Sequence, residues 1–92
     1  MLKPGYTPEE QYRTHGNQGP WTDVYALCAT MYRCITGTIP PESLERAYHE
    51  NLQPVRELAS DCPPAATYAI EKGMSIHTED RFQSMQELYS AL

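Results

Sequence analysis

The stretch from Pro20 to Gly37, PWTDVYALCATMYRCITG, constrains the fold of this chain more than any other segment. After Asp23, apolar or small residues occupy nearly every position of a helical wheel, and only Thr30 and Arg33 interrupt them. A helix that is apolar all round must be covered on several sides or lie in a membrane. The stretch falls short of the roughly 20 residues that span a bilayer and contains Arg33, so we expect a buried central helix.

Residues that begin and end helices flank this stretch. Thr22 or Asp23 can serve as the N-cap, because a short polar side chain there accepts a free backbone N–H. Gly37 can adopt the left-handed conformation that closes many helices. The residues at both ends of the stretch are therefore typical of a helix in a globular domain.

Composition and charge narrow the class of protein. The chain has 92 residues, and a domain of this size buries only about two-thirds of the surface of its unfolded chain. A formal charge of −5 without a basic stripe argues against a nucleic-acid partner.

The N-terminus lacks the basic start and apolar run of a signal peptide, so we expect a cytoplasmic location. The three cysteines show no CxxC spacing, and Cys28 and Cys34 are predicted to be reduced core thiols.

Two capping-box patterns predict helices near the ends of the chain. Thr7, Pro8 and Glu10 supply a capping residue, a proline at the first helical position and the acidic residue that completes the box. Ser84 and Glu87 form the same pattern before the last helix. We expect the apolar residues of that helix to dock on the core, namely Met85, Leu88, Tyr89 and Leu92.

The sequence of the middle of the chain predicts a helix over residues 42–49 and another over residues 64–72. An irregular segment, residues 50–61, connects them. In the first helix, Glu42 and Arg46 have the spacing of a surface ion pair. Pro54 excludes a long helix in the irregular segment, so we expect at most about one helical turn there. No segment shows sustained strand alternation. The sequence therefore predicts an all-α fold of about five helices around the central one.

Three separated motifs, GYTPEEQY, TDVYALCATMYRCITGTIPP and EDRFQSMQEL, follow one another along the chain in an order that resembles that of protein kinases. GYTPEEQY resembles the end of the activation segment, and TDVYALCATMYRCITGTIPP resembles the central helix of the large lobe with its following turn. EDRFQSMQEL resembles the arginine-containing loop before the last helix. The sequence thus resembles the C-terminal part of the large lobe of bacterial eukaryotic-like Ser/Thr protein kinases, which implies one partial kinase domain over residues 1–92.

This resemblance implies roles for individual residues. Glu10 matches the family's structural glutamate and Arg81 the arginine that pairs with it. On the residues alone, Glu10 would only close the capping box, and Arg81 would be a solvated loop arginine. Asp23 matches an aspartate that anchors the catalytic loop in complete kinases, although by itself it reads as a helix cap. A substrate-docking loop is implied at Lys3, Gly5, Tyr6, Thr7 and Pro8.

The sequence departs from the family pattern at three positions. Glu9 stands where the family usually has proline, and Cys28 stands where it usually has glycine. Lys3 falls where many Ser/Thr kinases place a threonine that faces the acceptor hydroxyl. Because Lys3 replaces this threonine, the chain lacks the residue type that is associated with a preference for substrate hydroxyls.

The motifs of phosphoryl transfer are missing from the sequence. A kinase needs a glycine-rich phosphate loop, a strand lysine, an HRD catalytic loop and a DFG aspartate that holds magnesium. None of them occurs in these 92 residues. The resemblance therefore implies a segment with no cofactor of its own, which is inactive alone, whereas an intact parent kinase would bind ATP and magnesium.

Two functions stay open at this point. The chain is either the scaffold and substrate-docking part of a kinase, or a free-standing interaction or inhibitory module derived from one. The partners implied are a protein substrate and the rest of a kinase domain, and neither nucleic acid nor a membrane is expected for this segment. The histidines His15, His49 and His77 are scattered and predict no metal site.

One face of the central helix lacks a predicted cover. Asp23, Leu27, Thr30 and Cys34 share this face by their spacing, and in a complete kinase it would meet the catalytic loop. Exposed apolar patches usually find partners. We therefore expect homodimerisation or segment exchange across this face.

Overall fold

The computed structural model describes residues 3–12 and 16–92. These ranges form five α-helices and no strand, which confirms the predicted all-α fold. The helices are α1 (Pro20–Thr36), α2 (Ser43–Tyr48), α3 (Val55–Leu58), α4 (Pro64–Gly73) and α5 (Met85–Ala91), with two 3-10 helices, η1 (Glu9–Tyr12) and η2 (Thr78–Asp80).

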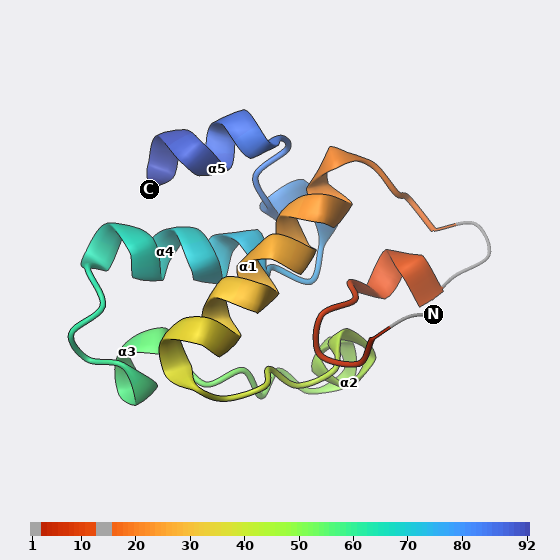
Figure 1. Ribbon diagram of the computed structural model, residues 1–92. Helices are drawn as coiled ribbons and strands as arrows, with labels where there is room; N and C mark the ends of the chain where they lie inside the picture. Colours follow the sequence, from red (N-terminus) through yellow and green to blue (C-terminus); the bar gives the residue numbers. More distant parts are fainter. Residues whose placement is uncertain (1–2, 13–15) are drawn as a thin grey trace.

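Helix α1 crosses the middle of the molecule, and the other elements lie around it (Figure 1). It packs against α3, α4 and α5, and α4 also contacts α3 and α5. In the view of Figure 1, α4 and α5 lie to the upper left of α1, whereas η1 and α2 lie to its lower right and contact each other. The central position predicted for this helix is therefore observed.

The two ends of α1 differ in how well the sequence predicted them. Gly37 adopts the left-handed conformation, with φ 74°, and closes the last turn as expected. The N-cap is Gly19, so the prediction of Thr22 or Asp23 as N-cap is wrong. The helix begins earlier because Pro20, which lacks an N–H and has a fixed φ, occupies its first position. Thr22 still takes part, since its hydroxyl accepts the Gly19 N–H at 3.1 Å.

Burial of α1 is one-sided. The residues that face the core are Val24, Tyr25, Cys28, Ala29 and Tyr32. On the opposite face, Leu27 is 41% exposed, and Asp23, Thr30 and Cys34 are also exposed. The prediction that Cys34 is a core thiol is wrong, because this residue lies on the uncovered face. That face will be called the open face, and consists of Asp23, Leu27, Thr30 and Cys34.

Helix α2 turns its polar side inward. Its buried residues are Ser43 and Arg46, whereas Leu44 is 41% and Tyr48 is 97% exposed. Arg46 pairs with Glu50, so the predicted surface pair between Glu42 and Arg46 is wrong. The rotation of the helix decides this outcome, because it carries the guanidinium of Arg46 into the core instead of along the surface.

Helix α5 begins at the predicted capping box but docks by fewer residues than expected. The Ser84 hydroxyl accepts the Glu87 N–H at 3.2 Å, which confirms the cap. Leu88 is buried, whereas Met85, Tyr89 and Leu92 are exposed. A helix of seven residues makes only about two turns, so few of its side chains can face α1 and α4, against which it packs.

Candidate functional site

Glu10 and Arg81 form a buried ion pair that joins the two ends of the chain. Arg81 Nη1 donates to Glu10 Oε2 at 2.6 Å, and Arg81 Nη2 donates to Glu10 Oε1 at 3.0 Å. The side chains are 0% and 3% exposed. This two-point geometry fixes the orientation of both groups, and a buried pair of this kind leaves a stranded charge when one partner is removed.

Further hydrogen bonds hold the pair in place. Arg81 donates to the backbone carbonyls of Ser75 at 2.6 Å, Ile76 at 3.0 Å and Trp21 at 3.2 Å. The Thr22 hydroxyl donates to Glu10 Oε2 at 2.9 Å. Burial by itself raises the pKa of Glu10, but the hydrogen bonds from Arg81 and the other donors outweigh it and hold that pKa below its ordinary value.

The capping box predicted for Glu10 is therefore not what holds the start of η1. Thr7 Oγ1 donates to the Lys3 carbonyl at 3.0 Å and accepts the Lys3 N–H at 3.1 Å. The carboxylate of Glu10 points to Arg81 instead. The prediction of a box between Thr7 and Glu10 is wrong, because the buried arginine is the stronger partner for a carboxylate.

The five residues implied as a docking loop form a turn that leads into η1 and contacts the start of α2. The buried Ser43 hydroxyl donates to the Thr7 carbonyl at 2.7 Å. Gly5 has φ 90°, and a Cβ there would stand 2.8 Å from the Pro40 carbonyl oxygen. Gly5, Thr7 and Pro8 are buried, Tyr6 is half-buried and Lys3 is exposed. The turn is thus fixed to the main body, while Lys3 faces the solvent.

Arg46 is a second buried arginine, and the sequence did not indicate its burial. The Arg46 side chain is 3% exposed, and its Nε and Nη2 donate to Glu50 Oε1 and Oε2 at 2.8 and 3.0 Å. Its Nη1 donates to the Tyr25 hydroxyl at 3.0 Å and to the Met74 carbonyl at 2.8 Å. The hydrogen bond from Arg46 lowers the pKa of Glu50. The four-residue spacing of Arg46 and Glu50 was an available signal, but the same spacing to Glu42 competed with it.

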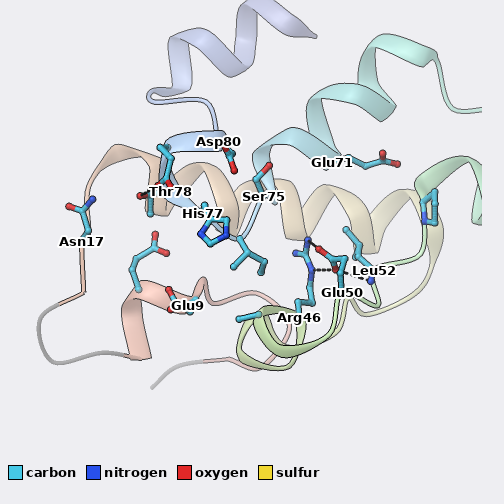
Figure 2. Close-up of a pocket in the computed structure, with 15 residues that line it drawn as sticks. Glu9, Asn17, Arg46, Glu50, Leu52, Glu71, Ser75, His77, Thr78 and Asp80 are labelled. Atoms are coloured by element: carbon cyan, nitrogen blue, oxygen red, sulfur yellow. Dashed lines mark hydrogen bonds and ion pairs between the residues drawn. The ribbon is translucent and has the colours of Figure 1, made fainter.

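A groove of about 840 Å³ opens between η1, α2 and the loop that follows α4 (Figure 2). Figure 2 shows Glu9 and Asn17 at one end of it, and Arg46 with Glu50 at the other. Among the described residues that line the groove, six are acidic, namely Glu9, Glu10, Glu50, Glu71, Glu79 and Asp80. The basic residues among them are Arg46 and His77. The groove is therefore negatively charged, which disfavours phosphate groups.

Asp23 does not line this groove; it lies in the first turn of α1, where its side chain is exposed. The described residues contain no group of three or more potential metal ligands. His49 and His77 are both exposed, and His15 lies outside the described residues. Across residues 3–12 and 16–92, no helix combines the length and apolar character needed to cross a membrane.

A known protein kinase is similar to this chain in sequence and a solved structure is similar to it in fold, although no family model matches the sequence. Over 76 residues, the chain is 32% identical to the serine/threonine-protein kinase PknD of Chlamydia trachomatis serovars D, L2 and L2b, an alignment that covers 77% of this chain and 8% of PknD. A solved structure described as "PpkA-294 apo form" matches with a TM-score of 0.89 and 37% identity, covering 99% of this chain and 32% of that one.

This chain is a kinase-derived segment. The sequence relation and the shared fold agree, and both confirm the resemblance indicated by the three motifs. The chain spans only 8% of the length of the curated relatives it matches and 32% of the solved structure. The substrates and ligands of a complete kinase are therefore assigned to this chain only under the proposed function below.

Proposed function

We propose that this chain forms the scaffold and substrate-docking part of the C-terminal lobe of a Ser/Thr protein kinase, as one partial kinase domain over residues 1–92. The buried pair of Glu10 and Arg81 carries the proposal, because it holds the segment of residues 3–12 against the loop before α5. A docking segment must be rigid to align a substrate, and a bidentate buried pair provides that rigidity.

Two surfaces of the segment are available to protein partners. The turn of residues 3–8 presents Lys3, and the outer side of α2 presents Leu44 and Tyr48. In the proposed assignment, Asp23 on the open face anchors the catalytic loop of an intact kinase. Its exposure supports this role, because a residue that contacts another part of a kinase must be accessible in the segment itself.

We further propose that the chain alone binds neither ATP nor magnesium and transfers no phosphate. The absence of the phosphate-binding and metal-binding motifs from the sequence supports this, as does the acidic lining of the groove. Titration calorimetry of the purified chain with ATP and magnesium tests it, with a complete kinase of the family as positive control. We expect no heat of binding, and saturable binding would contradict the proposal.

The second candidate is a free-standing interaction or inhibitory module, in which the open face of α1 binds a protein partner instead of a catalytic loop. Leu27 in the middle of that face is 41% exposed, as a surface for a second copy or another protein would require. The genomic DNA upstream of Met1 separates the two candidates. An in-frame lobe with catalytic motifs supports the kinase part, whereas a stop codon followed by a ribosome-binding site supports the module. The cytoplasmic location expected from the sequence stays a prediction.

A further inference from the structure

The buried pair of Glu10 and Arg81 and the half-exposed pair of Arg46 and Glu50 meet at one tyrosine. The Tyr25 side chain is fully buried on α1, and the Arg81 guanidinium carbon lies 4.9 Å from the centre of its ring. The Arg46 guanidinium carbon lies 6.0 Å from the same centre, and Arg46 Nη1 donates to the Tyr25 hydroxyl. An arginine over an aromatic ring is attracted by the ring's negative face. Tyr25 therefore contacts both cations, whose carboxylate partners are Glu10 and Glu50.

A run of backbone carbonyls after α4 makes a second connection between the pairs. The Met74 carbonyl accepts a hydrogen bond from Arg46, and the next two carbonyls, of Ser75 and Ile76, accept from Arg81. The carbonyl that anchors Arg46 is thus followed directly by the two carbonyls that anchor Arg81, with only two peptide units between the first and the last of them. The two guanidinium groups are thus linked by a side chain and by a short stretch of backbone.

The position of α2 depends on this polar network. Ser43 and Arg46 are its buried residues, whereas Leu44 and Tyr48 face outward, so burial of apolar surface contributes little to holding this helix. A buried charge is tolerated only when its hydrogen-bonding groups are satisfied, and Arg46 is satisfied by three groups from outside α2. The anchorage of α2 is therefore sensitive to the geometry around Tyr25.

We propose that the two ion pairs form one cooperative unit, in which Arg46 is a positioning residue that couples α2 to the segment of residues 3–12. The path runs from Glu50 through Arg46, Tyr25 and Arg81 to Glu10, beside the direct hydrogen bond from Ser43 of α2 to the Thr7 carbonyl. A protein bound to the outer side of α2 would then alter the docking turn without touching it. This consequence rests on the proposed function, whereas the coupling itself does not.

Amide hydrogen exchange of the full chain, measured residue by residue by NMR, tests the coupling. The variant is Arg46→Met, and its matched control is Arg33→Met, which replaces an exposed arginine on α1. The reporters are the amides of Gln11 and Thr22, which donate to the carbonyls of Pro8 and Gly19 beside the pair of Glu10 and Arg81.

We expect exchange at both reporters to accelerate at least about tenfold in Arg46→Met, because their local opening becomes easier. The Leu88 amide of α5, which donates to the Ser84 carbonyl, should change far less, and Arg33→Met should change none of the three. No nucleotide or substrate enters this measurement, so its result is independent of the docking proposal.

If Arg46→Met does not fold, Tyr25→Phe serves as the second variant. It keeps the ring beside Arg81 and removes only the hydroxyl that accepts from Arg46. We expect a smaller acceleration with the same pattern at Gln11 and Thr22. Acceleration confined to the amides of α2 would overturn the proposal, as would an equal acceleration at Leu88, which would report only a lower global stability.

Discussion

The sulfur of Cys28 lies against the backbone of Gly73 where α1 crosses α4, so close that a Cβ on Gly73 would overlap it. Such a Cβ would also stand 3.3 Å from Val24 Cγ1. The two helices approach this closely because residue 73 has no side chain. The resemblance to kinases implies glycine at the position of Cys28, and in this chain the space for its sulfur is provided by the facing helix.

Replacing Gly73 with alanine should destabilise the fold through this contact. We expect a loss of about 1–3 kcal/mol in the free energy of unfolding, the usual cost of adding a methylene to a filled core. Urea unfolding followed by circular dichroism measures it. Because the overlap is with the sulfur, the added substitution Cys28→Ala should recover part of the loss.

Gly37→Ala is the matched control for this rescue. Gly37 has φ 74°, and no heavy atom lies within 4 Å of the position that an alanine Cβ would take. Alanine there therefore costs only the strain of a left-handed backbone, roughly 1–2 kcal/mol. Cys28→Ala should not recover that loss. If it rescued both glycine variants equally, or neither, the steric account of Gly73 would be wrong.

The three cysteines should differ in reactivity. Burial raises the pKa of Cys28 to about 12, whereas Cys34 is exposed on the open face and Cys62 is half-buried. Because the thiolate is the nucleophile, Cys28 should resist N-ethylmaleimide at neutral pH while Cys34 reacts. Peptide mass spectrometry of the labelled chain measures each site. Labelling of Cys28 at a rate equal to that of Cys34 in the folded chain would contradict its burial.

The cap of α5 should contribute measurably to stability. The Ser84 hydroxyl accepts the Glu87 N–H, and replacing such a cap with alanine typically costs about 0.5–2 kcal/mol. We expect Ser84→Ala to lower the free energy of unfolding by that amount in a thermal or urea transition. Ser90→Ala, at an exposed position inside the same helix, is the control and should be close to neutral. Equal losses in the two variants would argue against a capping role.

Local signals predicted this fold well where one interaction decided the outcome. The end of α1 at Gly37 and the Ser84 cap follow from short-range chemistry, and both were predicted. The motif order also pointed to Glu10 and Arg81, which the structure brings within 2.6 Å although 71 residues separate them. Composition alone could not have paired them, since both residue types also suit a solvated loop.

What the sequence could not provide is the rotation of each helix about its axis. A six-residue helix such as α2 offers too few turns to define which face is buried, and its apolar residues Leu44 and Tyr48 are exposed. The same rotation buries Arg46, whose partners Tyr25 and Met74 lie 21 and 28 residues away. Such contacts depend on tertiary packing, and no local spacing encodes them.

The pair of Glu10 and Arg81 should dominate the response to acid. Replacing Glu10 with glutamine leaves the Arg81 charge buried without its carboxylate, which typically costs about 3–5 kcal/mol. The pKa of Glu10 is lowered below its ordinary value of 4.5, so the stabilisation is fully present above pH 4.5 and is lost as the pH falls toward the folded-state pKa.

Urea midpoints measured from pH 7 down to about pH 3 test this sign. The wild-type chain should lose stability below pH 4.5, and Glu10→Gln should be less stable at pH 7 but show a shallower decline in the acid range. Glu45→Gln, at an exposed position on α2, is the control and should keep the wild-type profile. An unchanged acid decline in Glu10→Gln would show that other carboxylates control it.

The open face of α1 should govern self-association of the chain. Leu27 and Leu44 are each 41% exposed, on α1 and α2 respectively, and so form a matched pair of sites. We expect light scattering at high protein concentration to show a dimer, and we expect Leu27→Lys to abolish it, because the new charge replaces the large apolar side chain at the centre of the contact and remains unpaired. Leu44→Lys should leave the dimer intact. A monomer at all concentrations, or disruption by Leu44→Lys alone, would remove the open face as the site of association.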